Sequence, residues 1–258
     1  MNRVQALLWD VDGTMAETER DGHRVAFNEA FEALGLPWHW SEEAYGDWLS
    51  VTGGLERVSH FMARQSVAPA LAGERRVLAE RIHQLKNQRY ALRVKAGVIA
   101  LRPGVKDLMA QARAAGLRLA ITSSTSRANL DALMHTHFGP LWQREFAAVV
   151  CREDVDVRKP EPDVYLTALK RLRLSPLACV AIEDSPGGAS AARAADVPVV
   201  VTRSHYFAHA PIEGAIAIGP SLDRRQGWTP ALDATPGDVG LSDILTWANE
   251  MNLVSQFG

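Results

Sequence analysis

The sequence predicts an α/β protein with a doubly wound, mostly parallel sheet and an inserted α-helical cap domain. Short apolar runs alternate with helical patterns in the second half of the chain, as in successive βαβ units. A long helical stretch separates the first apolar run from the others. Polar residues follow several of these runs, and the carboxyl ends of strands are where such sheets bind ligands.

Five apolar runs predict buried strands, because a parallel strand covered on both faces is apolar along its whole length. The runs are residues 6–9, 117–122, 147–150, 179–182 and 199–202. Helical segments at 129–138, 163–172 and 187–195 separate the last four of them.

The segment 17–95 contains helical patterns and turns but no convincing strand, which predicts a helical insertion. Pro103 and Gly104 are expected to open the helix that leads back to the sheet, since proline suits a first helical turn. We therefore expect a core of residues 1–16 and 99–258 and a cap of residues 17–98.

The C-terminal part predicts a long surface loop over residues 219–240, which are rich in Gly, Pro and Asp. Ser242 is expected to cap a last amphipathic helix that runs through Leu253. Nothing in this part points to a function.

Composition excludes several classes of protein. The 258 residues carry 28 Lys+Arg and 30 Asp+Glu, a formal net charge of -2, which gives no electrostatic footprint for nucleic acid or an anionic membrane. Cys151 and Cys179 are too few for a disulfide framework or a four-cysteine zinc site. No apolar stretch approaches the roughly 18 residues of a spanning helix. We expect a cytoplasmic protein without a membrane anchor.

Two carboxylates follow the first predicted strand at Asp10 and Asp12, directly before Gly13. On extended backbone both can point into one space, and Gly13 permits a tight turn. The alternative is a cluster that caps a helix or forms a turn. Close carboxylates at a buried strand end, however, repel one another unless a cation joins them.

A second acidic pair, Glu183 and Asp184, ends the run 179–182. Asp184 alone could equally well cap a helix. Together with Asp10 and Asp12 it forms a hard, oxygen-rich site of the kind that suits Mg²⁺. The two pairs therefore predict a magnesium site.

Hydroxyl groups and a lysine complete the polar strand ends. Four hydroxyl residues follow the run 117–122, namely Ser123, Ser124, Thr125 and Ser126. They can hold phosphate oxygens, although such a run more often caps a helix. Lys159, in a loop stiffened by Pro160, would usually be a solvated lysine, but beside a carboxylate it would keep that carboxylate ionised.

The order of these motifs resembles the haloacid dehalogenase-like hydrolase superfamily, and more narrowly its CbbY group. That group includes xylulose-1,5-bisphosphate phosphatases, which remove a misfire product that inhibits Rubisco of the Calvin cycle. The resemblance rests on Asp10-Val11-Asp12-Gly13-Thr14, Ser123, Lys159-Pro160, Ile182-Glu183-Asp184-Ser185, Glu17-Thr18-Glu19, His23, Ala26-Phe27-Asn28 and Gly53-Gly54-Leu55-Glu56-Arg57.

The resemblance implies a role for each core residue. Asp10 would be the nucleophile that forms an aspartyl-phosphate, and Asp12 the general acid that later activates water. Ser123 and Lys159 would complete the catalytic set. Mg²⁺ would be held by Asp10, the backbone carbonyl of Asp12 and Asp184, with Glu183 adjacent. Dehalogenases lack the second carboxylate, so Asp12 argues against dehalogenation.

The resemblance also implies that the cap selects a small phosphorylated sugar. The implied substrate-binding residues are Glu19, His23, Gly53, Gly54, Arg57, His83 and Lys86 of the cap, with Ser124 and Thr125 of the core. For each cap residue the alternative is a solvated helix face. The aromatic residues Trp38, Trp40, Tyr45 and Trp48 are expected to pack the cap rather than to bind substrate.

One departure from the group concerns Leu55, because the group carries Lys after the paired glycines. A cation for a distal phosphate is therefore missing, and Arg57 or Lys86 would have to replace it unless the substrate differs.

The expected function is that of a monomeric, Mg²⁺-dependent phosphatase acting on a sugar bisphosphate, xylulose 1,5-bisphosphate first. The alternatives are a phosphomutase of the β-phosphoglucomutase kind, a phosphoglycolate phosphatase, and a non-catalytic protein that binds a phosphorylated metabolite.

Overall fold

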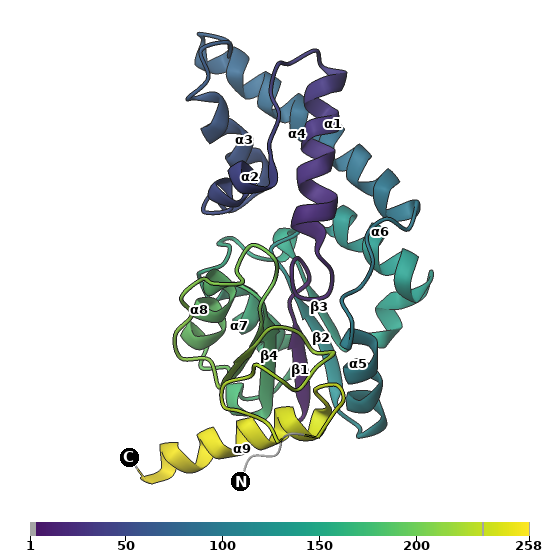
Figure 1. The fold of residues 1–258 in the computed structure, drawn as a ribbon, viewed down its shortest axis with the longest axis vertical. Coiled ribbons are helices and arrows are strands. Elements are labelled where there is room, and N and C mark those ends of the chain that lie inside the picture. Colours follow the sequence, from purple (N-terminus) through teal and green to yellow (C-terminus); the bar gives the residue numbers. More distant parts are fainter. Residues whose placement is uncertain (1–3, 234, 258) are drawn as a thin grey trace. The chain divides into compact units, whose positions relative to one another are not determined.

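The computed structural model describes residues 4–233 and 235–257, which form two compact units (Figure 1). The larger unit contains the chain up to Glu17, Ala100–Arg127 and the chain from His137 onward. The smaller unit contains Thr18–Ile99 and Ala128–Thr136. Among its described residues the smaller unit is helical and holds no strand of the sheet.

The larger unit is built on a six-stranded sheet with the order β3-β2-β1-β4-β5-β6 and only parallel pairings between these strands. The strands are β1 (Ala6–Trp9), β2 (Arg118–Thr122), β3 (Ala148–Val150), β4 (Cys179–Glu183), β5 (Val199–Thr202) and β6 (Ala217–Gly219). The five predicted strands are confirmed; β6, of only three residues, was not predicted. The strand order reverses between β1 and β4, and the carboxyl ends of strands at such a reversal are where sheets of this class bind ligands.

Helices cover both faces of this sheet, which confirms the predicted fold class. They are α5 (Val105–Ala114), α7 (Asp163–Leu172), α8 (Pro186–Ala194) and α9 (Leu241–Phe257). Helix α6 (Arg127–Phe138) is divided between the two units. Three 3₁₀ turns, η2 (Trp142–Glu145), η3 (Arg152–Asp154) and η4 (Pro176–Ala178), join the elements. Residues of α7 and α8 bury one sheet face, where Leu8, Ala120 and Ala181 lie (Figure 1).

The smaller unit has an aromatic core. Its elements are the π-helix η1 (Thr18–His23), α1 (Arg24–Ala33), α2 (Glu42–Trp48), α3 (Gly54–Met62) and α4 (Ala72–Lys95). Trp40 packs edge-on against Phe31 and Phe61 at 5.0 and 5.1 Å between ring centroids. Tyr45 is fully buried and Trp48 meets Phe61, so the predicted packing role of the aromatic residues is confirmed.

Two predicted helix starts are wrong. Pro103 lies in the turn before α5, and Gly104 is the N-cap residue, with a positive φ of 81° and the backbone of Leu222 where a Cβ would lie. Ser242 lies inside the first turn of α9, since that helix already begins at Leu241. The carboxylate of Asp243 instead reaches back to accept the Gly240 N–H at 2.9 Å.

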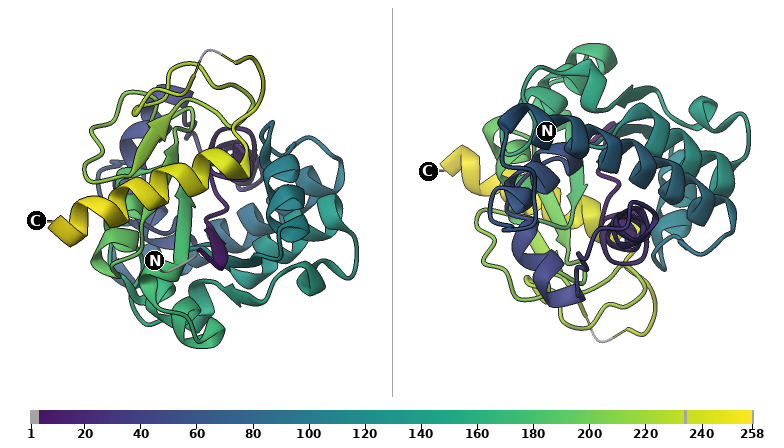
Figure 2. Two further views of the ribbon diagram at one scale, coloured as in Figure 1. Left: turned by 90° about the horizontal axis from the view of Figure 1, so that it is seen from below. Right: turned by 90° about the horizontal axis from the view of Figure 1, so that it is seen from above.

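The C-terminal segment is more firmly packed than a surface loop. Trp228 is buried and stacks on Trp247 of α9 at 5.0 Å between ring centroids. Arg225 donates to Asp243 at 2.5 Å. Figure 2 shows α9 running across the larger unit, and the Leu241 N–H at its start donates to Gln111 of α5. None of the helices in the described part of the chain is both long and apolar enough to cross a membrane.

A carboxylate, Asp154, ties three segments of the larger unit together. It accepts from Arg171 of α7 at 2.6 Å, from Arg127 at 2.9 Å and from the Cys151 N–H at 2.9 Å. Partial burial favours its neutral form, but these hydrogen bonds prevail and lower the pKa of Asp154 to about 2.

Asp154→Asn should therefore lower the free energy of unfolding at pH 7 by about 1 kcal/mol, since solvent screens the pairs. The wild-type advantage exists above the unfolded pKa of 3.8 and should fade as the pH falls toward 2. Urea unfolding at pH 7 and pH 2.5 measures the difference in the free energy of unfolding between wild type and variant. Asp156→Asn, at an exposed neighbouring position, is the control. A loss that is the same at both pH values would contradict this assignment.

Candidate active site

Three buried carboxylates meet at the carboxyl ends of two neighbouring strands. Asp10 follows β1, Glu183 ends β4, and Asp184 comes next. Each offers an oxygen that lies within 4.8 Å of the others, and all three side chains are buried. Three of the four carboxylates of the two predicted acidic pairs thus lie together at the reversal of the strand order.

Lys159 binds two of these carboxylates. Its Nζ donates to Asp10 Oδ1 at 2.7 Å, to Glu183 Oε1 at 2.6 Å and to the Thr122 carbonyl at 2.8 Å. An ammonium has three donors, so these contacts use all of them. Burial alone would lower the pKa of Lys159, but the carboxylates of Asp10 and Glu183 raise it well above its usual value. The lysine is therefore a buried fixed charge and not a solvated loop residue.

Burial outweighs the effect of this single ammonium on the carboxylates. Burial, opposed by Lys159 and assisted by Glu183, raises the pKa of Asp10 to about 7. Burial together with Asp10 and Glu183 raises the pKa of Asp184 well above its usual value. In both shifts burial is the largest cause, and the neighbouring carboxylates add to it. A bound cation would lower both values.

Asp184 sits in a tight setting formed by the turn after β1. Gly13 has a φ of 88°, and a Cβ on it would overlap the carboxylate of Asp184. Thr14 Oγ1 lies 3.5 Å from Asp184 Oδ1, and the Ser204 hydroxyl hydrogen-bonds the same carboxylate. Asp12, between Asp10 and this turn, is half-buried.

Ser123 lies at the end of β2, the neighbour of β1, and is buried. Its Oγ accepts the Thr125 N–H at 3.1 Å, and its own N–H donates to Val150 of β3 at 3.0 Å. The hydroxyl therefore has a fixed place, and its hydrogen can be donated to an oxyanion. Ser124 and Thr125 are half-buried in the same loop.

The smaller unit brings Glu19 and Arg57 together through Tyr45. Arg57 Nη1 donates to the Tyr45 hydroxyl at 2.6 Å and lies 3.4 Å from Glu19 Oε2, while the Tyr45 hydroxyl donates to Glu19. Arg57 Nε donates to the Trp48 carbonyl at 3.1 Å. Arg57 is thus buried and held in place, not part of a solvated helix face, and Tyr45 does more than pack.

The other predicted cap residues make separate contacts. His23 stacks on Tyr90 at 4.2 Å between ring centroids. Lys86 is buried, with Nζ 5.6 Å from the Tyr90 ring centroid. Gly53 and Gly54 begin α3, and Gly54 lies against the ring of His83.

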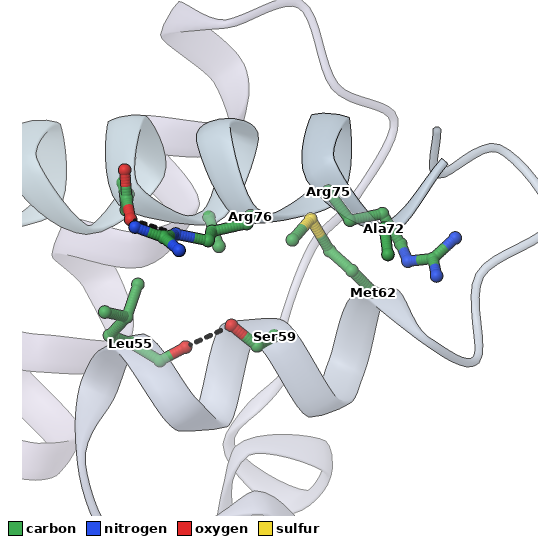
Figure 3. A pocket seen from close by; sticks show the side chains of 8 residues that line it. Leu55, Ser59, Met62, Ala72, Arg75 and Arg76 are labelled. Atoms are coloured by element: carbon green, nitrogen blue, oxygen red, sulfur yellow. Dashed lines mark hydrogen bonds and ion pairs between the residues drawn. The ribbon is translucent and has the colours of Figure 1, made fainter. Parts of the chain in front are cut away.

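Leu55 faces a cavity of about 300 Å³ between α3 and α4 (Figure 3). Leu55, Ser59 and Met62 line it from α3, and the Ser59 hydroxyl donates to the Leu55 carbonyl at 2.8 Å. Ala72, Arg75, Arg76, Ala79 and Glu80 line it from α4. No carboxylate of the acidic cluster lines this cavity.

Four residues around the carboxylates had no role predicted from the sequence. Tyr165 of α7 donates its hydroxyl to Glu183, and its ring centroid lies 5.2 Å from Lys159 Nζ. Thr14, Ser204 and Arg102 surround Asp184 or the turn beside it. Tyr165 fits the apolar stripe of its helix, so no sequence signal separates it from a core residue.

Gly13→Ala should destabilise the protein by about 2 kcal/mol or more, because it adds a clash with Asp184 to the strain of a positive φ. Gly116→Ala is the matched control: Gly116 has a φ of 79° but open space around it. Urea unfolding of both variants measures the difference. Equal losses would mean that the approach to Asp184 is not tight.

Comparisons with known proteins agree with this geometry. Residues 4–196 match the family model of the haloacid dehalogenase-like hydrolases. The plasmid-encoded protein CbbY of Cupriavidus necator is 45% identical over 219 residues, which cover 85% of this chain and 86% of that protein.

Solved structures of CbbY from Rhodobacter sphaeroides are similar too. A complex with phosphate matches at 40% identity and a TM-score of 0.77, over 84% of this chain and 94% of the other. An Asp-to-Asn variant in complex with xylulose 1,5-bisphosphate matches at 39% identity, with the same TM-score and coverage. This chain belongs to the haloacid dehalogenase-like hydrolases and, within them, to the family of the CbbY proteins.

Proposed function

We propose that this enzyme, a sugar-phosphate phosphatase of its family, is Mg²⁺-dependent and hydrolyses xylulose 1,5-bisphosphate or a close relative. The observation that carries the proposal is the buried Asp10 carboxylate, held at 2.7 Å by Lys159 beside two further carboxylates. The complex of a CbbY variant with xylulose 1,5-bisphosphate supports the substrate.

The donor set fits Mg²⁺. Asp10, Glu183 and Asp184 supply buried carboxylate oxygens, and the raised pKa of Asp10 reflects uncompensated negative charge. Hard oxygen ligands of this kind suit Mg²⁺, which binds few carboxylates and keeps waters and phosphate oxygens. Asp10, the Asp12 carbonyl and Asp184 would hold it, with Glu183 adjacent. When bound, the ion neutralises charge on the transferred phosphoryl group.

The residues of the chain divide the chemistry in two steps. Asp10 attacks phosphorus, the P–O bond to the sugar breaks, and Asp12 donates a proton to the departing sugar oxygen. Asp12 then takes a proton from a water that attacks phosphorus, which releases phosphate and the free Asp10 carboxylate. Lys159 lowers the pKa of Asp10 and so favours its ionised form, and Ser123 donates to a phosphoryl oxygen.

The smaller unit is the proposed source of substrate selection, because the core groups contact only the phosphoryl group. Arg57 offers the charge for a distal phosphate that Leu55 does not supply. Tyr45 and Glu19 orient its guanidinium. His23, His83 and Lys86 with Gly53 and Gly54 complete the proposed set, and Ser124 and Thr125 belong to it on the core side.

A phosphate-release assay with Mg²⁺ tests the function. We expect xylulose 1,5-bisphosphate to be preferred over ribulose 1,5-bisphosphate, 2-phosphoglycolate and β-glucose 1-phosphate. Asp10→Asn should abolish release and leave the fold intact, as circular dichroism would show. Full activity in that variant would refute the mechanism, and conversion of β-glucose 1-phosphate to glucose 6-phosphate without free phosphate would indicate a mutase.

Arg57→Ala should raise KM for a bisphosphate about tenfold more than KM for a monophosphate, because only the former has a distal phosphate to lose. Steady-state kinetics with both substrates measure the ratio, and Arg64→Ala serves as control, since Arg64 lies just after α3 over the Trp48 ring. The same rise in KM for both substrates would show that Arg57 does not bind the distal phosphate.

A further inference from the structure

Arg102 is a buried arginine on the segment that leads from the smaller unit back into the sheet. Its Nη1 donates to the Gly13 carbonyl at 2.5 Å and to the Thr202 carbonyl at 2.9 Å. Its Nη2 donates to Thr202 Oγ1 at 3.2 Å, to the Arg203 carbonyl at 2.7 Å and to the Pro220 carbonyl at 3.2 Å. One guanidinium thus joins three segments that are far apart in the sequence.

Two of these segments enclose Asp184. Gly13 packs so closely on the Asp184 carboxylate that no side chain fits there. On the other side, the chain that follows Thr202 and Arg203 provides Ser204, whose hydroxyl hydrogen-bonds Asp184. Arg102 therefore fixes the distance between the Gly13 turn and the segment 202–204, which contact the Asp184 carboxylate from two sides.

The arrangement depends on the shape of arginine. Five acceptors around a planar fork cannot be served by the point charge of a lysine. The acid nearest to Arg102, Glu17, lies 3.7 Å from Nε, so the carbonyl groups provide most of the solvation of the buried charge. The guanidinium is buried and so is not available to bind a substrate. Most of its hydrogen bonds go to backbone carbonyl groups.

We propose that Arg102 is a positioning residue that sets the affinity of the Asp184 site for Mg²⁺ by holding the Gly13 turn and the segment 202–204 together. The inference rests on the proposed function, because it presumes that Asp184 is a metal ligand. Groups that orient metal ligands without touching the metal change metal affinity about 10- to 100-fold when they are removed.

The inference also gives a role to the C-terminal part of the chain. Residues 197–258 lie beyond the segment that matches the family model. Within them Pro220 supplies a carbonyl to Arg102, and the backbone of Leu222 packs where a Cβ of Gly104 would lie. This part of the chain thus also helps to hold Arg102 in place.

The test measures Mg²⁺ binding directly, by isothermal titration calorimetry with MgCl₂ on wild type, Arg102→Met and Arg102→Lys. Both variants should raise the Kd for Mg²⁺ about tenfold or more. Thr202→Val, which removes one acceptor and keeps the shape, should raise it about threefold and serves if the arginine variants fail to fold. Arg118→Met is the matched control, since Arg118 donates to the Leu172 carbonyl at 2.9 Å from the first residue of β2.

Thermal unfolding with and without MgCl₂ separates positioning from structural support. A positioning role predicts that the Mg²⁺-induced rise in Tm shrinks in the Arg102 and Thr202 variants but not in Arg118→Met. If the Arg102 and Thr202 variants have a lower Tm but an unchanged Kd for Mg²⁺ and an unchanged Mg²⁺-induced rise in Tm, the positioning role of Arg102 is refuted. The proposed function is not affected by that result. Absence of Mg²⁺ binding by the wild type would overturn the proposed metal dependence, and the inference with it.

Discussion

The buried ammonium of Lys159 is the contact on which the active site depends. It joins Asp10, Glu183 and the end of β2 within 2.8 Å, and without it three buried carboxylates would face one another. Removing one partner of such a buried pair is expected to cost several kcal/mol, because the other charge stays uncompensated. The same lysine lowers the pKa of Asp10 and so favours the ionised nucleophile, which makes both stability and chemistry depend on this side chain.

The fold meets this electrostatic demand with contacts between distant segments. Strands β1 and β4 bring Asp10 and Asp184 together, the loop after β3 brings Lys159, and α7 brings Tyr165. Arg102 then fixes the turn after β1 to the end of β5. The carboxyl ends of parallel strands lie at the same edge of a sheet. Charged residues that are far apart in the sequence can therefore interact there.

The sequence predicted what depends on local pattern. Apolar runs indicated five of the six strands, and the acidic pairs at strand ends indicated the site. Arg102 and Tyr165 could not be foreseen, because their acceptors are groups that only the folded chain brings near. The start of α9 was misplaced because Ser242 is a residue type that favours the capping position, whereas in the structure it lies inside the helix and Asp243 accepts the Gly240 N–H.

The central claim is that Asp10, held by Lys159, becomes phosphorylated during turnover. Acid quenching during turnover of xylulose 1,5-bisphosphate with Mg²⁺, followed by borohydride reduction and peptide mass spectrometry, tests it most directly. The account predicts that Asp10 is converted to homoserine, the product of a reduced acyl phosphate, while Asp12 and Asp184 are unchanged. Rapid phosphate release with no reduction at Asp10, or with reduction at another carboxylate, would contradict it.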